Sequence, residues 1–239
     1  MKAALIGFGR FGKLFYKFFK NDFDFQIYDK YEYSFNRIKL KSLNEFDNDV
    51  SIIFFAIPIS SFLEISKTLR KKIRPGSLIV ELSSLKIYPL KVLKKYFPEN
   101  KILGLHPLFG PDSVKQTLKG HQIVVVNEFE LDKQIEYTLK AFLKKGVEIK
   151  YLTSKAHDEL MAYTLCLTQF IGRSLGKLNL PDNTIGTKGY FDLLNIVRRT
   201  NNDTLQLFID MNKFNPYSQR MRKKLIQSFS EINKIIDLK

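Results

Sequence analysis

The first twelve residues, Met1-Lys-Ala-Ala-Leu-Ile-Gly-Phe-Gly-Arg-Phe-Gly12, decide the expected fold of this chain. An apolar run leads into three closely spaced glycines, and an amphipathic stretch, 13–20, follows them. This order predicts a buried strand, a tight turn and a helix whose free N–H groups face an anion. In a dinucleotide-binding turn the first glycine allows the bend, the second admits the pyrophosphate and the third lets the helix pack on the sheet.

The segment after this turn favours a dinucleotide over a purely structural strand-turn-helix unit. A second strand is expected at 23–28 and ends at Asp29, where such a unit carries the acid that binds the ribose hydroxyls of NAD. The loop after the third strand faces the same ligand. The expected cofactor-binding residues are Gly7, Phe8, Gly9, Arg10, Phe11, Gly12, Asp29, Ile57 and Pro58.

Alternating strands and helices predict an α/β protein. Further strands are expected at 50–57, 77–82, 102–105, 122–126 and 147–151, and helices at 62–73, 90–96 and 131–144. The polar stretch 30–48 reads as a loop with a short helix or a minor strand. The expected fold is an N-terminal Rossmann-type doubly wound, mostly parallel sheet over 1–151, followed by a smaller all-helical domain over 152–239.

The helical half has two features of its own. Thr153 or Ser154 can cap its first helix, with Asp158 and Glu159 expected in the first turn, where they suit the helix dipole. A helical bundle of this size needs a further surface to bury its apolar side chains. We therefore expect a homodimer formed through the helical domain.

Composition limits the remaining function classes. The chain has 239 residues and a formal net charge of +15, but no nucleic-acid recognition motif accompanies the charge, so a surface suited to anionic substrates is the simpler interpretation. The single cysteine, Cys166, excludes an intramolecular disulfide, and one Cys with three His forms no metal-ligand pattern. No apolar run approaches membrane-spanning length and no cleavable signal is visible, so a cytoplasmic location is expected.

Two strand ends carry the candidate chemistry, Glu81-Leu-Ser-Ser-Leu-Lys86 and Leu103-Gly-Leu-His-Pro-Leu-Phe-Gly-Pro-Asp112. A neutral imidazole at His106 can accept a proton from a substrate hydroxyl as a hydride leaves its carbon, or it can simply form a hydrogen bond in a tight turn. Ser84 can orient His106, bind the substrate or cap a helix. Lys86 can attract a carboxylate or belong to the general basic surface.

Several motifs together resemble the prephenate/arogenate dehydrogenase family. They are the glycine turn, Ser83-Ser-Leu-Lys86, His106-Pro-Leu-Phe-Gly-Pro111 and His157-Asp158. In the helical half, Gln169-Phe-Ile-Gly-Arg-Ser-Leu-Gly-Lys177 and Thr187-Lys-Gly-Tyr190 are similar to the plant-type arogenate dehydrogenase branch. The resemblance covers nearly the whole chain.

The resemblance implies an oxidative decarboxylation of arogenate or prephenate on the route to tyrosine. It makes His106 and Ser84 the expected catalytic residues. The residues expected to bind the substrate are Ser83, Lys86, His157, Gln169, Arg173 and Lys188. Prephenate-specific relatives carry an arginine where this chain has Asn195, which gives weight to arogenate.

The cofactor expected from the sequence is NAD, with NADP as the alternative. Asp29 repels a 2′-phosphate, although Lys30 offsets part of that repulsion, and plant-type relatives usually prefer NADP. Two other functions stay open. One is a dehydrogenase or imine reductase that acts on another small carboxylate, and the other is a non-catalytic NAD-binding regulator whose basic surface contacts nucleic acid.

Overall fold

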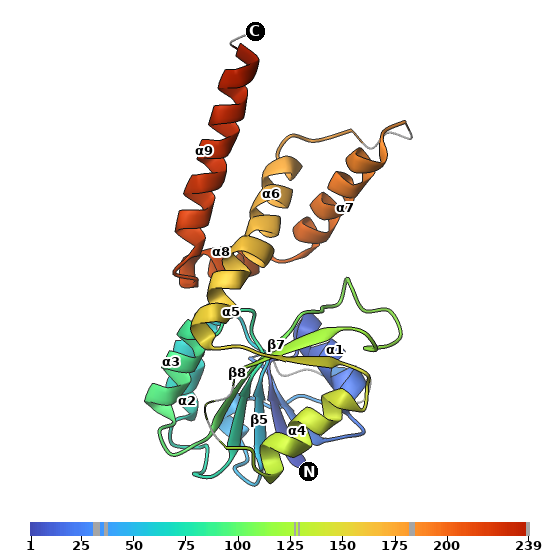
Figure 1. The fold of residues 1–239 in the computed structure, drawn as a ribbon. Coiled ribbons are helices and arrows are strands. Elements are labelled where there is room, and N and C mark those ends of the chain that lie inside the picture. The colour runs from blue at the N-terminus through green and yellow to red at the C-terminus, as the bar shows by residue number, and fades with distance from the viewer. Residues whose placement is uncertain (31–33, 36–37, 127, 129, 182–184, 238–239) are drawn as a thin grey trace. The chain divides into compact units, whose positions relative to one another are not determined.

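The computed structural model describes residues 1–30, 34–35, 38–126, 128, 130–181 and 185–237. The chain divides into two compact units, Met1–Ser154 and Lys155–Lys239. The first unit is a sheet with helices on both faces, and the second is helical (Figure 1). The predicted fold class is therefore confirmed. No helix in the described ranges is both long enough and apolar enough to cross a membrane.

Seven strands form one sheet among the residues that the structure describes, in the order β2-β1-β5-β6-β7-β8-β9. Their bounds are β1 Lys2–Ile6, β2 Asp24–Tyr28, β5 Ile52–Phe55, β6 Leu78–Glu81, β7 Ile102–Pro107, β8 Gln122–Val126 and β9 Glu148–Tyr151. Strands β2, β1, β5, β6 and β7 are mutually parallel, whereas β8 is antiparallel to β7 and parallel to β9. The parallel strands are almost wholly apolar because both faces of the sheet are covered.

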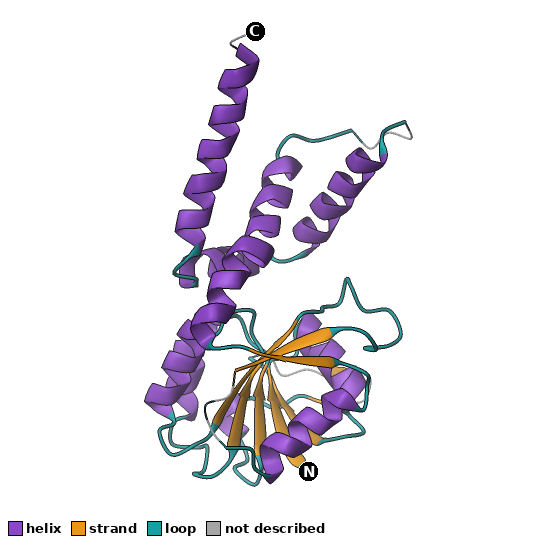
Figure 2. Cartoon of the chain, in the orientation of Figure 1, coloured by secondary structure: helices purple, strands orange, loops and turns teal. Residues whose placement is uncertain are grey.

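Two pairs of helices cover the sheet (Figure 2). Helices α1 (Arg10–Phe19) and α4 (Lys133–Leu143) pack on one face, where the Phe19 ring lies 4.6 Å from that of Phe15 and 4.5 Å from that of Phe142. Helices α2 (Phe62–Leu69) and α3 (Ile87–Tyr96) pack on the other face with a second apolar cluster. Such aromatic contacts add stability beyond the area they bury.

The stretch 30–48 has only small elements where the structure describes it. They are β3 (Ser34–Phe35), β4 (Ile38–Lys39) and a 3-10 turn, Leu43–Glu45. Another 3-10 turn, Ile59–Ser61, leads into α2. Residues 31–33 and 36–37 of the predicted loop lie outside the described residues.

The second unit consists of α5 (Ser154–Met161), a π-helical turn (Ala162–Cys166), α6 (Leu167–Gly176), α7 (Lys188–Asn202), α8 (Leu205–Phe214) and α9 (Ser218–Asp237). The hydroxyl of Thr187 accepts a hydrogen bond from the Tyr190 N–H at the start of α7, and Thr204 caps α8 in the same way. One prediction here is wrong. Because α5 already begins at Ser154, Asp158 and Glu159 both lie beyond its first turn, which holds no acidic residue, and Asp158 is buried.

Candidate functional site

The carboxyl ends of the parallel strands bring most of the predicted site residues of the first unit to one edge of the sheet. The glycine turn, which we define as residues 7–12, follows β1, and Asp29 follows β2. Ile57 and Pro58 follow β5, and the segment 82–86, here called the serine loop, follows β6. His106 lies near the end of β7. Ligands of open α/β sheets bind at this edge.

The glycine turn is shaped by the lack of side chains. Gly7 has a φ of +94°, and a Cβ atom there would lie 2.4 Å from the Ala56 carbonyl oxygen. A Cβ atom on Gly12 would lie 2.2 Å from the Gly7 carbonyl oxygen, whereas one on Gly9 would meet no atom within 4 Å. Gly7 and Gly12 are therefore needed for the fold, and Gly9 leaves open space at the start of α1.

The start of α1 suits a phosphate group. Gly9 is its N-cap residue, no side chain caps the helix, and no acidic residue lies in its first turn. The unpaired N–H groups and the positive end of the helix dipole both favour an anion.

Asp29 is fixed beside this turn. Its Oδ2 atom accepts a hydrogen bond from the Phe8 N–H at 2.6 Å. Ile57 is buried against the turn, because its Cγ2 atom would lie 3.0 Å from a Cβ atom on Gly7. The acid, the turn and the end of β5 thus adjoin one another as the sequence indicated.

Two residues that were expected to bind the cofactor, Arg10 and Phe11, have side chains that contact other parts of the protein. One guanidinium nitrogen of Arg10 donates to both carboxylate oxygens of Asp112, with both N···O distances at 2.8 Å. This pair joins the glycine turn to the segment that follows β7. The Phe11 side chain is partly buried and packs against the apolar core, with its ring centroid 6.3 Å from that of Phe15.

His106 belongs to β7 itself. The sequence predicted that this strand would end at Leu105, but antiparallel pairing with β8 extends it, since His106 pairs with Val124 and Pro107 with Ile123. The side chain of His106 is 6% exposed. A histidine in such a position is held by the sheet, which suits a group that must meet a substrate in one fixed pose.

The serine loop differs from the prediction in the role of its lysine. The side chains of Lys86 and Glu81 are both 0% exposed and form an ion pair, and Lys86 Nζ also donates to the Leu105 carbonyl oxygen at 2.8 Å. Burial raises the pKa of the Glu81 carboxyl, and the neighbouring ammonium of Lys86 opposes that shift. Lys86 is thus turned into the protein, and the expected direct contact with a substrate carboxylate does not fit this placement.

The two serines of the loop differ. Ser83 donates its hydroxyl to the Leu85 carbonyl oxygen at 2.9 Å. Ser84 Oγ is buried and has no hydrogen-bond partner among the described residues, so the expected hydrogen bond to His106 is not formed. A buried hydroxyl without a partner costs free energy, which a hydrogen bond to a ligand would recover.

In the helical unit, three predicted residues are buried or tied to neighbours. His157 is 0% exposed, and its Nδ1 atom lies 2.7 Å from Asp158 Oδ1. Gln169 donates to Asp203 Oδ2 at 2.6 Å, and Arg173 donates to the Asp203 carbonyl oxygen at 2.6 Å. Gln169 and Arg173 therefore meet at the α7–α8 connection.

Each side chain of that pair keeps one buried polar atom unused. Gln169 Oε1 and Arg173 Nε have no hydrogen-bond partner in the described part of the chain. Lys188, in contrast, has a side chain that is 90% exposed and pairs with Asp192 one turn along α7. Its placement is that of a surface lysine.

Sequence reasoning missed Glu81, Asp112 and Asp203 as partners of site residues. Glu81 has a signal, because an acid that ends a buried strand needs a counterion and Lys86 is the next basic residue along the chain. The other two pair with residues far away in sequence, and nothing local marks them.

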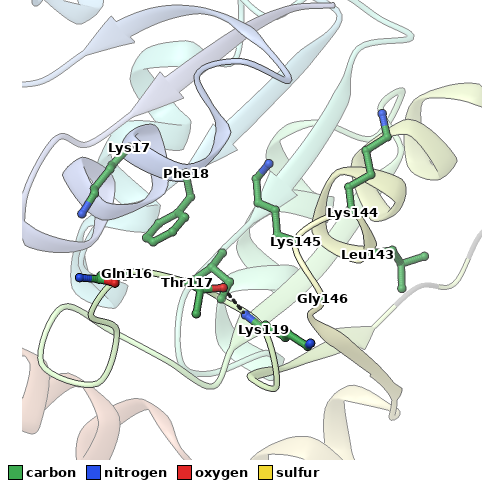
Figure 3. Close-up of a pocket in the computed structure, with 10 residues that line it drawn as sticks. Lys17, Phe18, Gln116, Thr117, Lys119, Leu143, Lys144, Lys145 and Gly146 are labelled. Carbon is green, nitrogen blue, oxygen red and sulfur yellow. Dashed lines mark hydrogen bonds between the residues drawn. The ribbon is translucent and has the colours of Figure 1, made fainter.

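The first unit also has a hollow of about 540 Å³ that none of the predicted site residues lines. Figure 3 shows lysines from three segments around it, with Phe18 on one wall. Those lysines are Lys17, Lys119, Lys144 and Lys145, and the last pairs with Asp22 at 2.5 Å. The hollow adds to the positive surface of the chain and is separate from the serine loop and His106.

The sheet, the glycine turn and Asp29 define a dinucleotide-binding domain of the type found in dehydrogenases. Residues 28–151 match the nucleotide-binding domain of prephenate dehydrogenase, and residues 174–238 match the TYRAAT1-like, C-terminal domain. The chain belongs to the prephenate dehydrogenase family.

Individual proteins agree with this assignment. The chain is 27% identical to arogenate dehydrogenase 2, chloroplastic, from Arabidopsis thaliana over 98% of its own length and 69% of that protein. It is 29% identical to arogenate dehydrogenase 1, chloroplastic, from the same plant, over 77% of its own length but only 30% of that protein. Its fold resembles that of prephenate dehydrogenase from A. aeolicus, solved with hydroxyphenyl propionate and NAD+, with a TM-score of 0.75, 16% identity and coverage of 99% and 90% of the two chains.

Proposed function

We propose that this protein is a dehydrogenase that uses NAD to decarboxylate arogenate or prephenate oxidatively, in the biosynthesis of tyrosine. One observation carries the proposal: a single sheet edge holds a nucleotide-binding turn, a histidine in β7, and an unpaired serine hydroxyl in the loop after the neighbouring strand β6. The names of the plant relatives support the class of substrate.

The glycine turn fits a dinucleotide on its own geometry. The open space at Gly9 and the uncapped start of α1 suit the pyrophosphate, and the Asp29 carboxylate suits the ribose hydroxyls. The same carboxylate repels a 2′-phosphate, which favours NAD over NADP. When bound, the nicotinamide supplies the acceptor for a hydride.

The proposed chemistry at the other strand ends follows from the side chains. His106 would accept the proton of the ring hydroxyl as a hydride leaves the carbon that bears this hydroxyl. Ser84 forms a hydrogen bond to that hydroxyl and so gains the partner it lacks. The bond from the ring to its carboxylate then breaks and carbon dioxide leaves. The electron pair of that bond moves into the ring, which becomes aromatic, and the carbonyl oxygen formed in the oxidation takes up a proton to become the phenol hydroxyl.

We further propose that the helical unit recognises the side chain of the substrate through Gln169, Arg173 and Asp203. The unused Arg173 Nε is a donor suited to a carboxylate, and the unused Gln169 Oε1 is an acceptor suited to an ammonium group. Arogenate carries both groups on its side chain, whereas prephenate carries a keto acid. The cluster therefore favours arogenate.

His157 belongs to the same proposal as a substrate-binding residue. Asp158 fixes the orientation of its buried ring, since the Nδ1 atom lies 2.7 Å from Asp158 Oδ1. Ser83 and Lys188 have weaker support, because Ser83 is bonded within its own loop and Lys188 is a surface lysine.

A homodimer through the helical unit also belongs to the proposal. Helix α9 extends away from α6 and α7 (Figure 1), and five of its large apolar side chains are more than half exposed. They are Ile226, Phe229, Ile232, Ile235 and Ile236. Exposed apolar residues that line one side of a helix mark an interface, and a second copy of the chain presents the same self-complementary surface.

Phe229→Glu tests the dimer. We expect the wild-type protein to have the mass of a dimer by light scattering at micromolar concentration and the variant to have the mass of a monomer, because a charge cannot be buried unpaired. Gln227→Glu, which adds the same charge on the other side of α9, is the control. A wild-type monomer would contradict the proposed dimer.

The expected cytoplasmic location stays a prediction. The chain has one cysteine, Cys166, so no intramolecular disulfide of the kind that forms in oxidising compartments is possible, and burial keeps its thiol protonated by raising its pKa to about 12. The names of both plant relatives place those proteins in the chloroplast. Fractionation of source cells with an antibody to the protein decides the matter.

Turnover by the purified protein tests the proposed activity. Arogenate and prephenate are each supplied with NAD and with NADP, and the absorbance of reduced nicotinamide is followed. We expect the fastest turnover with arogenate and NAD. The absence of turnover with all these combinations would contradict the proposal.

A further inference from the structure

The buried ion pair of Glu81 and Lys86 has no part in the chemistry proposed above, yet it borders both catalytic groups. Glu81 is the last residue of β6, and Lys86 is the residue before α3. Ser84 lies in the loop between them. Both side chains are 0% exposed, so neither one meets a ligand directly.

The pair holds two strands and the serine loop together through polar atoms. One carboxylate oxygen of Glu81 accepts the N–H of Ser83, the residue before Ser84. The other oxygen accepts a hydrogen bond from Lys86 Nζ. That ammonium also donates to the carbonyl oxygen of Leu105, the residue before His106, at 2.8 Å.

The stem of Lys86 is fixed by close packing. A Cβ atom on Gly104 of β7 would lie 3.3 Å from Lys86 Cδ and 3.3 Å from Leu90 Cδ1. The ammonium therefore reaches Leu105 along one defined path between α3 and β7.

Stability alone gives little reason to bury two charges here. The free energy lost when a carboxylate and an ammonium leave water offsets most of the free energy gained from their attraction. A well-packed pair of apolar side chains often stabilises a fold equally well or better. An apolar pair, however, offers neither the acceptor for the Ser83 N–H nor the donor for the Leu105 carbonyl. Those two bonds are what the charged pair adds.

We propose that Glu81 and Lys86 are positioning residues that fix the Ser84 hydroxyl and the His106 imidazole relative to each other. The proposal rests on the proposed dehydrogenase function. The pair does not contact the substrate. It holds the backbone N–H of Ser83 and the backbone carbonyl of Leu105, the residues that precede Ser84 and His106, and so fixes where these two side chains begin.

The test compares single and double variants. Lys86→Met leaves a buried carboxylate unpaired, whereas Glu81→Leu with Lys86→Met replaces the pair by apolar side chains. Lys94→Met, which breaks the exposed ion pair between Lys94 of α3 and Glu128, is the control. The readouts are the melting temperature, the NAD dissociation constant, kcat, KM and the NMR resonance of the His106 ring.

We expect the double variant to melt near the wild-type temperature and to bind NAD within about twofold of wild type, while its kcat falls by at least about tenfold. The His106 resonance shifts in the double variant and not in the control. A double variant whose kcat lies within about twofold of wild type would overturn the proposal, because the pair would then have only a structural role.

Two further measurements test the proposal if the double variant does not fold or if the wild-type protein shows no turnover. If the double variant does not fold, Glu81→Gln, which removes the charge and keeps the shape, takes its place, and an unchanged kcat and an unchanged His106 resonance would count against the proposal. If the wild-type protein turns over neither substrate, the proposed function fails. The positioning proposal is then judged on the His106 resonance alone, and a resonance that does not move in a folded variant overturns it.

Discussion

The glycine turn after β1 and the serine loop after β6 solve the same problem in opposite ways. Both are short connections at the carboxyl edge of the sheet, and both must hold their backbone in one conformation. The glycine turn does so by leaving side chains out, since a Cβ atom on Gly7 or Gly12 would collide with backbone oxygens. The serine loop does so with a buried ion pair, Glu81 and Lys86.

The difference matches what each loop is proposed to bind. A pyrophosphate is recognised by N–H groups and needs open space, so side chains at Gly9 would obstruct it. A substrate hydroxyl is recognised by particular side chains, so the loop that carries Ser84 must present them at a fixed position. Substitutions in the two loops should therefore affect different steps.

The largest expected effect is at His106, beside the serine loop. His106→Asn removes the proton acceptor, so we expect kcat to fall by about two to four orders of magnitude. The NAD dissociation constant, measured by fluorescence titration, should stay within about twofold because the glycine turn is untouched. An unchanged kcat would remove His106 from the mechanism.

Two alanine substitutions sharpen the account of the glycine turn. Gly7→Ala places a Cβ atom 2.4 Å from the Ala56 carbonyl oxygen at a φ of +94°, so we expect it to destabilise the fold by about 2 kcal/mol or more in chemical denaturation. Gly9→Ala meets no protein atom within 4 Å. It should leave stability unchanged and weaken NAD binding by about tenfold, because it fills the space for the pyrophosphate. Equal stability of the two variants would contradict the assignment of Gly7 to the fold and Gly9 to NAD binding.

Sequence alone could predict the glycine turn but only part of the serine loop. The requirement for glycine is local, so the spacing of Gly7, Gly9 and Gly12 and the position of Asp29 were enough to predict that region. The succession of strands and helices along the chain also followed from alternating apolar segments. Lys86 was misjudged because Glu81, the acid that ends the preceding strand, was not taken as its counterion, and its other partner, the Leu105 carbonyl, comes near only when β6 and β7 pair.

The helical unit shows the same limit. Its helical character was predictable from apolar spacing, and Gln169 and Arg173 were named from the family resemblance. Their common partner Asp203 was not, since it lies more than one helix away along the chain. Long-range pairs of polar side chains depend on the folded arrangement and leave no periodic pattern.

A smaller effect is expected at Asp29. Asp29→Asn keeps a hydrogen-bond acceptor for the Phe8 N–H but loses the charge that repels a 2′-phosphate. We expect the ratio of kcat/KM for NAD to kcat/KM for NADP to fall by about tenfold, the scale of one charged hydrogen bond. A ratio that does not change would show that Asp29 does not face the ribose.

The smallest expected effect that distinguishes the serine loop from the glycine turn is that of a substitution at Ser84. Ser84→Ala removes a hydroxyl that has no partner in the described chain, so the melting temperature should stay the same or rise slightly. We expect kcat/KM for the substrate to fall by about tenfold, since the hydrogen bond to the substrate hydroxyl is lost. A large loss of stability would mean that the hydroxyl already serves the fold.

The most direct test of the whole account measures reduced nicotinamide and carbon dioxide in one reaction with arogenate and NAD. Oxidation at the ring hydroxyl followed by loss of the carboxylate predicts equal amounts of the two products, formed at the same rate, with tyrosine as the aromatic product. Reduced nicotinamide without carbon dioxide would contradict the proposed reaction, and so would the absence of both.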